Sequence, residues 1–329
     1  MATRISIIGI TGYTGLELLR LACAHPETEI VHVTSRQHDG VAIGDVYPHL
    51  AHLDLTISNP DLDKIAQDSD VVFLCLPHKT AQDTVAALYG KVKIIDLSAD
   101  FRLDDVQTYE NYYNTPHNYP DLLDKAVYGL PEIIGHELIK NADIIANPGC
   151  FALLSQIMLF PFANNIQQAD IMAITGSSGA GKSPSDGTHH PVRNHNLKSY
   201  NINKHRHIPE ICRSAKINEN QLNFVPTSGP FTRGIFATAF VKTTAPFTPA
   251  EFYTNQPFIR VQDQVAIANV AGSNFCDLNI TPVDDTNFIV QGVIDNLVKG
   301  AAGCAIQNMN ITCGYDETLG LTSLGPLYP

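Results

Sequence analysis

The sequence predicts a two-domain α/β protein that begins with a doubly wound parallel sheet. The first half alternates apolar, strand-like runs with helix-like segments, a rhythm typical of parallel sheets covered by helices. A glycine-rich turn joins the first strand to the first helix. After about residue 147, strands follow one another with few helices between them, which predicts a second, α+β domain with a mixed, largely antiparallel sheet. A chain of 329 residues is long enough for both domains.

The expected elements of the first domain alternate along the chain. The strands are RISIIGI (4–10), EIVHVTS (29–35), DVVFLCLP (70–77), VKIIDLS (92–98) and ADIIANPG (142–149). The helices are LELLRLACAHP (16–26), LDKIAQD (62–68) and TAQDTVAALYG (80–90). The tyrosine-, asparagine- and proline-rich stretch YENYYNTPHNYP (109–120) indicates a long irregular connection.

The expected elements of the second domain are mostly strands. They are ADIMAITG (169–176), NFVPTSG (223–229), GIFATAFVKTT (234–244), VAIANVAG (265–272), CDLNITPV (276–283) and NFIVQGVID (287–295). A buried helix is expected over LLSQIMLF (153–160), and a last helix, rich in small residues, over NLVKGAAGCAIQNMN (296–310).

Composition excludes several classes of function. The formal net charge of -12 and the pI of about 5.4 disfavour a nucleic-acid partner, so an anionic small substrate needs a locally basic pocket. Seven cysteines without CxxC spacing suggest neither a disulfide framework nor a zinc ribbon, and they favour a reducing, cytoplasmic setting. No run approaches the roughly 20 apolar residues of a membrane span, and glycines interrupt the N-terminal apolar run before it resembles a signal peptide.

The turn GITGYTG contains Gly9, Gly12 and Gly15 directly after the first strand. Such a turn brings backbone N–H groups close to a pyrophosphate at a helix N-terminus, although the spacing differs from GxGxxG and a plain tight turn is the alternative. The second strand ends in Thr34, Ser35 and Arg36, where NAD-binding proteins place an acidic residue on the ribose. A hydroxyl and a guanidinium suit a 2′-phosphate, which favours NADP over NAD. An ordinary solvated arginine is the alternative.

The segment GSSGAGKS, from Gly176 to Ser183, matches the phosphate-binding loop of nucleotide triphosphatases. Such a loop must lead into a helix, but the following PSDGTHHPVRN contains two prolines and a glycine. We therefore do not interpret Lys182 and Ser183 as a triphosphate site. The remaining interpretation is a glycine-rich loop that lets the backbone approach a cofactor closely.

Cys150 lies in NPGCFA, between a turn signal and the apolar helix. A thiol in the first turn of a helix faces unpaired N–H groups and the positive end of the dipole, which favour the thiolate. Packing as a small hydrophobe is the alternative.

His205, Arg206 and His207 precede a helix that begins near Pro209. No cluster of further ligands completes a metal site, so no metal is expected. A histidine at a helix start suits proton transfer near neutrality, and Glu210 can share its face. A solvent-exposed histidine pair is the alternative.

Four arginines are candidates for anion binding, because their bidentate geometry suits phosphate and carboxylate. They are Arg102, Arg193, Arg206 and Arg233. Near the C-terminus, Asn296 precedes the small residues 300–303, which suggests a flat ligand close to this helix. A helix cap and tight packing are the alternatives.

Together, GITGYTG, TSR, DLSADFR, ANPGCF, GSSGAGK, HRHIPEI, PFTRGI and VIDNLVKGAAG resemble N-acetyl-gamma-glutamyl-phosphate reductases, within the wider aspartate-semialdehyde dehydrogenase group. The resemblance extends in order from Ile5 to the C-terminal helix. It implies an NADP-binding Rossmann domain over residues 1–147, completed by the C-terminal helix 296–329, and a catalytic and oligomerisation domain over 148–295. Lys182, where the family usually has arginine, and the loop PSDGTHHPVRNHN depart from the family pattern.

The resemblance also implies roles for individual residues. Cys150 corresponds to the nucleophile and His207 to the acid/base, with Glu210 beside them. The expected cofactor-binding residues are Gly9, Thr11, Gly12, Tyr13, Thr14, Gly15, Ser35, Arg36, Leu76, Pro77, Ser98, Ser178, Gly179, Gly181 and Asn296. The expected substrate-binding residues are Arg102, Asn147, Arg193, His205 and Arg206, with Arg102 and Arg206 favoured.

The implied reaction reduces an acyl phosphate with NADPH to a semialdehyde and phosphate, through a thioester on Cys150. The implied assembly is a homodimer or homotetramer. One related branch acts on a carrier-protein-bound aminoadipyl phosphate of lysine synthesis, and the loop at 184–196 leaves the acyl group open. A phosphotransferase built on Lys182 and a non-catalytic NADP-binding regulator are alternatives from other classes.

Overall fold

The computed structural model describes residues 2–246, 248 and 252–322, and the chain divides into two compact units. The first comprises the residues up to Asn147 together with Ala305–Leu321, and the second comprises Pro148–Cys304 and, of the described residues, Thr322. The domains expected from the sequence, 1–147 with the C-terminal segment 296–329 and 148–295, stay predictions. Residues 323–329 of that expected segment lie outside the described residues.

The first unit contains an eight-stranded sheet of order β3-β4-β2-β1-β5-β6-β8-β7. Neighbouring strands pair in parallel, except that β3 pairs antiparallel with β4. The strands are β1 (Thr3–Ile8), β2 (Thr28–Thr34), β3 (Val41–Ala42), β4 (Thr56–Ser58), β5 (Val71–Leu74), β6 (Lys93–Asp96), β7 (Val127–Tyr128) and β8 (Ile144–Ala146). The central strands β1 and β5 are almost completely buried, which explains their continuous apolar sequences.

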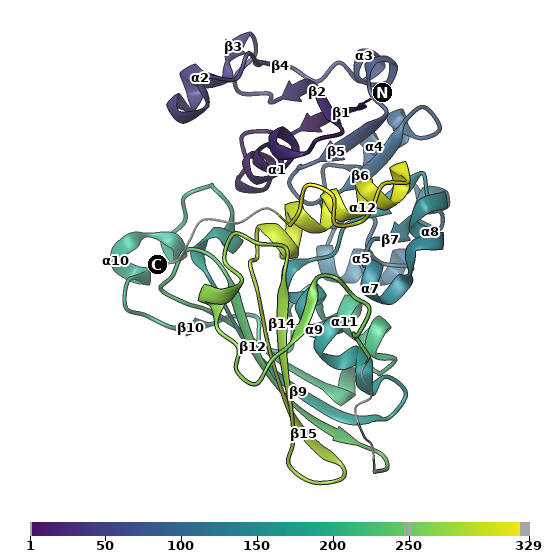
Figure 1. Ribbon diagram of the computed structural model, residues 1–329, viewed down its shortest axis with the longest axis vertical. Coiled ribbons are helices and arrows are strands. Elements are labelled where there is room, and N and C mark those ends of the chain that lie inside the picture. The colour runs from purple at the N-terminus through teal and green to yellow at the C-terminus, as the bar shows by residue number, and fades with distance from the viewer. Residues whose placement is uncertain (1, 247, 249–251, 323–329) are drawn as a thin grey trace. The chain divides into compact units, whose positions relative to one another are not determined.

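Helices connect these strands, as a doubly wound sheet requires (Figure 1). They are α1 (Tyr13–Ala24), α2 (Ile43–Val46), α3 (Leu62–Asp68), α4 (Gln82–Leu88), α5 (Val106–Tyr113), α6 (Pro120–Leu123), α7 (Pro131–Ile134) and α8 (His136–Asn141). The expected parallel sheet is therefore confirmed.

The irregular connection expected at 109–120 is wrong, because α5 occupies its first half and α6 begins at its end. Asp105 caps α5 by accepting the Thr108 N–H at 2.7 Å, and Asn114 ends the helix in the left-handed conformation. Tyr109 and Tyr113, one helical turn apart, stack with ring centroids 4.9 Å apart. Burial of these rings outweighs the weak helix propensity of the segment.

The second unit contains a seven-stranded sheet of order β10-β11-β9-β12-β15-β14-β13. Its strands are β9 (Ile166–Thr175), β10 (Lys198–Ser199), β11 (Leu222–Ser228), β12 (Ile235–Thr243), β13 (Ile259–Val261), β14 (Cys276–Pro282) and β15 (Asn287–Ile294). Two neighbouring pairs, β11 with β9 and β13 with β14, are parallel and the rest are antiparallel. The expected mixed, largely antiparallel sheet is confirmed.

Helices α9 (Cys150–Leu159) and α11 (Ile208–Ala215) lie side by side on this sheet (Figure 1). Gly292 of β15 faces α9, since a Cβ at Gly292 would lie 2.8 Å from Leu154 Cδ1. A short helix, α10 (His190–Arg193), follows the glycine-rich segment. The last helical region consists of a π-helical turn, Val298–Ala302, followed by α12 (Gly303–Cys313).

The strand expected at 265–272 is wrong, because this segment contains a short 3-10 turn, Ile267–Asn269. Ile267 instead packs on the chain at Gly234, where a Cβ would lie 2.5 Å from its Cγ2. The edge of the sheet is taken by β13, which pairs with β14. Among the described residues, no helix is both long and apolar enough to cross a bilayer.

Candidate active site and cofactor-binding turn

The glycine-rich turn after β1 is shaped by close backbone packing. Gly9 has φ +94°, and a Cβ there would lie 2.4 Å from the Cys75 carbonyl oxygen. A Cβ at Gly15 would lie 2.5 Å from the Gly9 carbonyl oxygen. The N–H groups of Gly9 and Ile10 both donate to the Thr34 carbonyl at 3.0 Å. Any side chain at Gly9 or Gly15 would therefore force this backbone apart.

Gly12 differs from these two glycines because space is open around it. A Cβ at Gly12 would meet only the Gly9 carbonyl oxygen, at 3.8 Å. Gly12 caps α1, so the N–H groups of the first helical turn, from Tyr13 to Gly15, have no acceptor within the helix. Thr11 and Thr14 are half-buried, and Tyr13 is 40% exposed. An open helix N-terminus after a buried parallel strand fits a dinucleotide pyrophosphate.

Ser35 and Arg36 follow β2 beside this turn. Ser35 is buried, and its hydroxyl lies 3.3 Å from Thr11 Oγ1, whereas Arg36 is exposed. The side chain of Arg36 is therefore able to reach a phosphate outside the turn. The expected preference for NADP stays a prediction.

Leu76, Pro77 and Ser98 lie at the carboxyl ends of β5 and β6. Leu76 is half-buried and Pro77 is exposed, whereas Ser98 is completely buried. The Ser98 hydroxyl donates to Asp96 Oδ2 at 2.7 Å, and burial raises the pKa of Asp96 to about 7. Ser98 therefore stabilises the end of β6 through this buried carboxyl.

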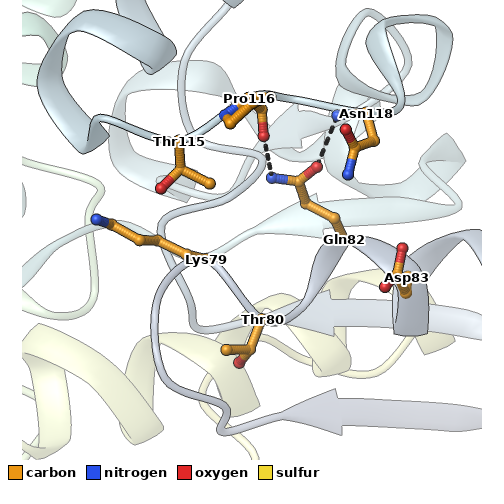
Figure 2. A pocket seen from close by; sticks show the side chains of 7 residues that line it. All are labelled: Lys79, Thr80, Gln82, Asp83, Thr115, Pro116 and Asn118. Atoms are coloured by element: carbon orange, nitrogen blue, oxygen red, sulfur yellow. Dashed lines mark hydrogen bonds between the residues drawn. The ribbon is translucent and has the colours of Figure 1, made fainter.

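Asp100, also completely buried, holds the segment that follows β5. It accepts the N–H groups of Lys79 at 2.7 Å and Ala81 at 2.9 Å, and the Tyr109 hydroxyl at 3.0 Å. A shallow pocket of about 120 Å³ opens beside this segment, where Figure 2 shows Gln82 bonded to Pro116 and Asn118. Its lining is polar and carries both a lysine and an aspartate.

Arg102 is buried and binds backbone. Its Nε donates to the Asn147 carbonyl at 2.8 Å, and its Nη2 donates to the Leu97 carbonyl at 2.9 Å. Asn147 in turn receives a hydrogen bond from Asn308 Nδ2 on its side-chain oxygen at 3.2 Å. These bonds indicate that Arg102 fixes the chain just before NPGC. The expected roles of Arg102 and Asn147 toward substrate stay predictions.

In the second unit, Cys150 is the first residue of α9, and Gly149 caps the helix. The Gly149 N–H donates to Glu210 Oε2 at 3.1 Å, and Glu210 is completely buried in the first turn of α11. This hydrogen bond joins the N-termini of α9 and α11. Cys150 is partly exposed and sits where the helix dipole favours a thiolate.

His205 and His207 are both buried, so the alternative of an exposed histidine pair is wrong. Their ring centroids lie 4.6 Å apart, and the Phe151 ring lies 5.5 Å from His205 and 6.2 Å from His207. His205 Nδ1 accepts the His207 N–H at 3.2 Å, which places the His205 proton on Nε2. Burial, followed by the nearby Arg206 charge, lowers the pKa of His205 to about 4.

Tyr200 joins this cluster, although the sequence analysis missed it. Its ring lies 5.8 Å from that of His205, and burial together with the charge of Cys150 raises the pKa of Tyr200 to about 12. Tyr200 follows the two-residue, exposed strand β10, which is too short to show a periodic pattern. Arg206 is exposed and makes no hydrogen bond or ion pair with the described residues. It is therefore free to bind an anion near Cys150.

The other two arginines bind the protein itself. Arg193 is half-buried and donates to the carbonyls of Gly229 at 3.0 Å and Thr175 at 3.2 Å. Arg233 lies 3.4 Å from Asp295, which is completely buried. Arg193 is therefore oriented toward backbone carbonyls, and Arg233 toward a carboxylate. The substrate role expected of Arg193 stays a prediction.

The segment 176–183 contains a 3-10 turn, Ser177–Ala180, and is not followed by the long helix of a triphosphate-binding loop. Ser178 is buried and donates to the Thr232 carbonyl at 2.7 Å, whereas Gly179 and Gly181 are exposed. Asn296 donates to Ser178 Oγ at 2.9 Å and accepts the Gly234 N–H at 2.7 Å.

Asn296 is therefore not the helix cap that the sequence offered as its alternative role. Asp295 caps the turn instead, by accepting the N–H groups of Leu297 and Val298. The cofactor contacts expected of Ser178, Gly179, Gly181 and Asn296 stay predictions. No group of three or more metal-binding side chains occurs among residues 2–246, 248 and 252–322.

Two domain families match this chain, one in each half of the sequence. Residues 4–142 match the NAD-binding domain of semialdehyde dehydrogenases, and residues 150–296 match their dimerisation domain. The chain is 41% identical to N-acetyl-gamma-glutamyl-phosphate reductase of Methanopyrus kandleri over 338 residues, covering 98% of both chains. It is 42% identical to the enzyme of that name from Pelotomaculum thermopropionicum over 350 residues, covering 100% of both.

Solved structures show the same fold at low sequence identity. Aspartate semialdehyde dehydrogenase II of Vibrio cholerae matches with a TM-score of 0.71 at 16% identity, over 95% of this chain and 99% of that chain. The Candida albicans enzyme, solved with NADP, matches with a TM-score of 0.67 at 15% identity, over 94% of this chain and 98% of that chain. Both sheets of the present structure thus belong to an architecture that is already known.

Proposed function

The chain belongs to the N-acetyl-gamma-glutamyl-phosphate reductase family, and we propose that it reduces N-acetyl-L-glutamyl 5-phosphate to N-acetyl-L-glutamate 5-semialdehyde and phosphate with NADPH. This is a step of arginine biosynthesis, carried out in the cytoplasm. The observation that carries the proposal is Cys150 in the first turn of α9, whose neighbour Phe151 packs against the buried imidazoles of His205 and His207.

Cys150 acts as the nucleophile. Its thiolate attacks the acyl carbon, the bond from that carbon to the phosphate oxygen breaks, and inorganic phosphate leaves with the electron pair. A thioester then joins the acyl group to Cys150. Gly149 and Glu210 position the sulfur, because their hydrogen bond fixes the start of α9 against α11. Glu210 is thus a positioning residue rather than a proton donor.

His207 is the acid/base in this proposal. It takes the thiol proton before attack and gives that proton to the oxyanion that hydride addition forms. It then removes the proton again as the C–S bond of the thiohemiacetal breaks, which releases the semialdehyde and the Cys150 thiolate. His205, which stays neutral at physiological pH, accepts the His207 backbone N–H and so orients the segment that carries the base. Arg206 binds the phosphate or the substrate carboxylate, since it is exposed and free beside the histidines.

Bound NADPH supplies a hydride to the thioester carbon. The turn formed by Gly9, Gly12 and Gly15 would hold the pyrophosphate, because the N–H groups of the first turn of α1 are open there. Arg36, exposed after the end of β2, would bind the 2′-phosphate. The N–H groups and side chains of the turn would thus bind and orient the dinucleotide.

A second copy of the chain covers the open face of the second sheet, giving a homodimer or homotetramer. Met172 of β9 and Phe240 of β12 are 45% and 54% exposed on the face opposite α9. Apolar side chains of this size on adjacent strands favour a protein interface. Sedimentation of the purified chain measures its mass, and a strictly monomeric mass at micromolar concentration would contradict this arrangement.

One assay tests the reaction and the acyl group together. NADP reduction is followed with phosphate and N-acetylglutamate semialdehyde, the aminoadipate analogue or aspartate semialdehyde, in wild type, Cys150→Ser and the control Cys23→Ser. We expect activity with the first compound, its loss in Cys150→Ser, and its retention in Cys23→Ser, which changes an exposed cysteine of the first unit.

Other outcomes of this assay would redirect the assignment. Preference for the aminoadipate analogue would move the substrate to the lysine branch. Cofactor binding without oxidation of any of the three semialdehydes would favour a regulator, and undiminished activity in Cys150→Ser would refute the mechanism. ATP turnover that depends on Lys182 would favour a phosphotransferase.

A further inference from the structure

The turn that precedes α12 has an unusual backbone. Over Val298–Ala302 the helix is π-type: the Gly300 N–H donates to the Asp295 carbonyl and the Ala302 N–H to the Leu297 carbonyl, each at 2.9 Å. Turns with this five-residue spacing are rare in proteins and occur frequently at functional sites. This turn is therefore a candidate for a functional role.

Gly300 lies directly against the proposed nucleophile, within the same unit. A Cβ at Gly300 would lie 2.8 Å from Cys150 Cβ and 3.3 Å from Ile294 Cδ1. Carbon atoms in contact normally lie about 3.5–4.0 Å apart. Only glycine allows the turn and the start of α9 to approach this closely, so even one methyl group would displace Cys150 or the turn.

The turn is held in place by Asp295, which is completely buried. Its Oδ1 accepts the N–H groups of Leu297 at 2.8 Å and Val298 at 3.1 Å. Its Oδ2 accepts the Gly272 N–H at 2.7 Å and lies 3.4 Å from Arg233 Nη1. A turn anchored through both carboxylate oxygens is not free to retreat, so a methyl group at residue 300 acts mainly on Cys150.

We propose that Gly300 is a positioning residue for Cys150, and that the π-helical turn serves to place a side-chain-free surface against the nucleophile. Two independent constraints then set the position of the sulfur: Glu210 fixes the backbone of the cap, and Gly300 limits where the Cys150 Cβ can lie. The proposal rests on the proposed function of Cys150. Displacement of a reacting atom by about 1 Å reduces turnover on the order of 100-fold.

The test compares Gly300→Ala with Gly187→Ala. A Cβ at Gly187 would meet no atom within 4 Å, so Gly187→Ala adds the same methyl group to the same unit without crowding Cys150 or the turn. For each variant we measure kcat, KM, and the rate and pH dependence of Cys150 alkylation by iodoacetamide, located by peptide mass spectrometry. Alkylation requires no turnover, so it reports on the thiol even if the substrate assignment fails.

In Gly300→Ala, we expect kcat to fall about 10- to 100-fold with little change in KM, and the pH profile of alkylation to shift. Gly187→Ala should keep both properties close to wild type. The proposal is overturned if a folded Gly300→Ala keeps wild-type kcat and alkylation, or if Gly187→Ala loses as much. If wild type alkylates at Cys150 but oxidises none of the three semialdehydes, the proposed function fails while the alkylation comparison still decides the role of Gly300.

A second measurement covers the case in which Gly300→Ala does not fold. Gly300→Ala is introduced into Cys150→Gly, which removes the Cβ that the new methyl group would meet. We expect the folded protein to be recovered, with a melting temperature near that of Cys150→Gly alone. An equal loss of folding in both backgrounds would show that the contact with Cys150 is not responsible, and would overturn the proposal.

Discussion

Buried His205 should make the protein less stable below neutral pH, and the size of the effect follows from its environment. The pKa of His205 is lowered from 6.5 to about 4, first by burial and then by the Arg206 charge. The hydrogen bond from the His207 N–H to Nδ1 acts in the same direction, because a protonated Nδ1 would direct its own hydrogen at this donor. The folded protein thus keeps His205 neutral where the unfolded chain protonates it.

The sign and size of the change in the free energy of unfolding follow from this difference in proton binding. Between about pH 6.5 and 4 the unfolded state binds one more proton, so stability falls as the pH is lowered through this range. At roughly 1.4 kcal/mol per pKa unit, the loss at pH 5 relative to pH 7.5 is about 2 kcal/mol. The raised pKa of Asp96 acts in the opposite direction, since its folded form holds a proton up to about pH 7.

A comparison of variants removes the contribution of Asp96. In His205→Asn, the side-chain oxygen can take the place of Nδ1 as acceptor, and the titrating imidazole is gone. Urea unfolding at pH 7.5 and pH 5 should show a loss in the wild type that exceeds the loss in His205→Asn by about 2 kcal/mol. His195→Asn is the matched control, because His195 is exposed and its positive φ of 56° suits asparagine.

The reasoning is refuted if wild type and His205→Asn lose the same stability between the two pH values. A histidine NMR titration gives an independent check. A His205 resonance that titrates near pH 6.5 in the folded protein would show that the imidazole is not desolvated.

Two further predictions concern the segment after β5. Lys79→Gly should stabilise the protein by roughly 0.5–1 kcal/mol in urea unfolding, because Lys79 has φ +72° at an exposed position, whereas Lys64→Gly in α3 should destabilise it by about 1 kcal/mol. A destabilised Lys79→Gly would contradict the strain argument. Asp100→Asn should cost about 1–3 kcal/mol in the same measurement. The Lys79 and Ala81 N–H groups bind different carboxylate oxygens, and an amide replaces one of these oxygens with an NH2 group that cannot accept. Asp83→Asn, at an exposed position, should cost less than about 0.5 kcal/mol, and equal losses would refute the role given to Asp100.

The sequence predicted those parts of the fold that depend on local pattern. Strands β1, β5 and β6 are buried on both faces, so their apolar runs are unmistakable. The connection at 109–120 was missed because its helix is stabilised by packing of Tyr109 and Tyr113 rather than by propensity. The false strand at 265–272 has strand-like composition, but its isoleucine packs on Gly234 instead of joining a ladder. Both errors concern contacts distant in the sequence, which periodicity does not report.

The candidate site shows the same limit at the level of side chains. Motif spacing singled out Cys150 and His207, and the structure places both at neighbouring helix N-termini. The sequence could not distinguish arginines that bind backbone, such as Arg102, from Arg206, which is exposed. Residue type is the same in both, and only the fold determines where each guanidinium points. Tyr200 carried no motif at all.

The first unit is built from two segments that lie far apart in the sequence, so a ribosome makes them at different times. Its core includes Ala305–Leu321, and hydrogen bonds join His25 to Asn310 and Thr3 to Tyr315 at 2.9 Å each. A ribosome adds roughly 5–20 residues per second, so Thr3 and His25 are made about 15 to 60 seconds before their partners in this segment. During translation, Pro148–Cys304 of the second unit are complete before Ala305–Leu321 of the first unit are made. The earliest-made part of the polypeptide is therefore the last to close, and a nascent chain truncated before residue 305 would leave it unfinished.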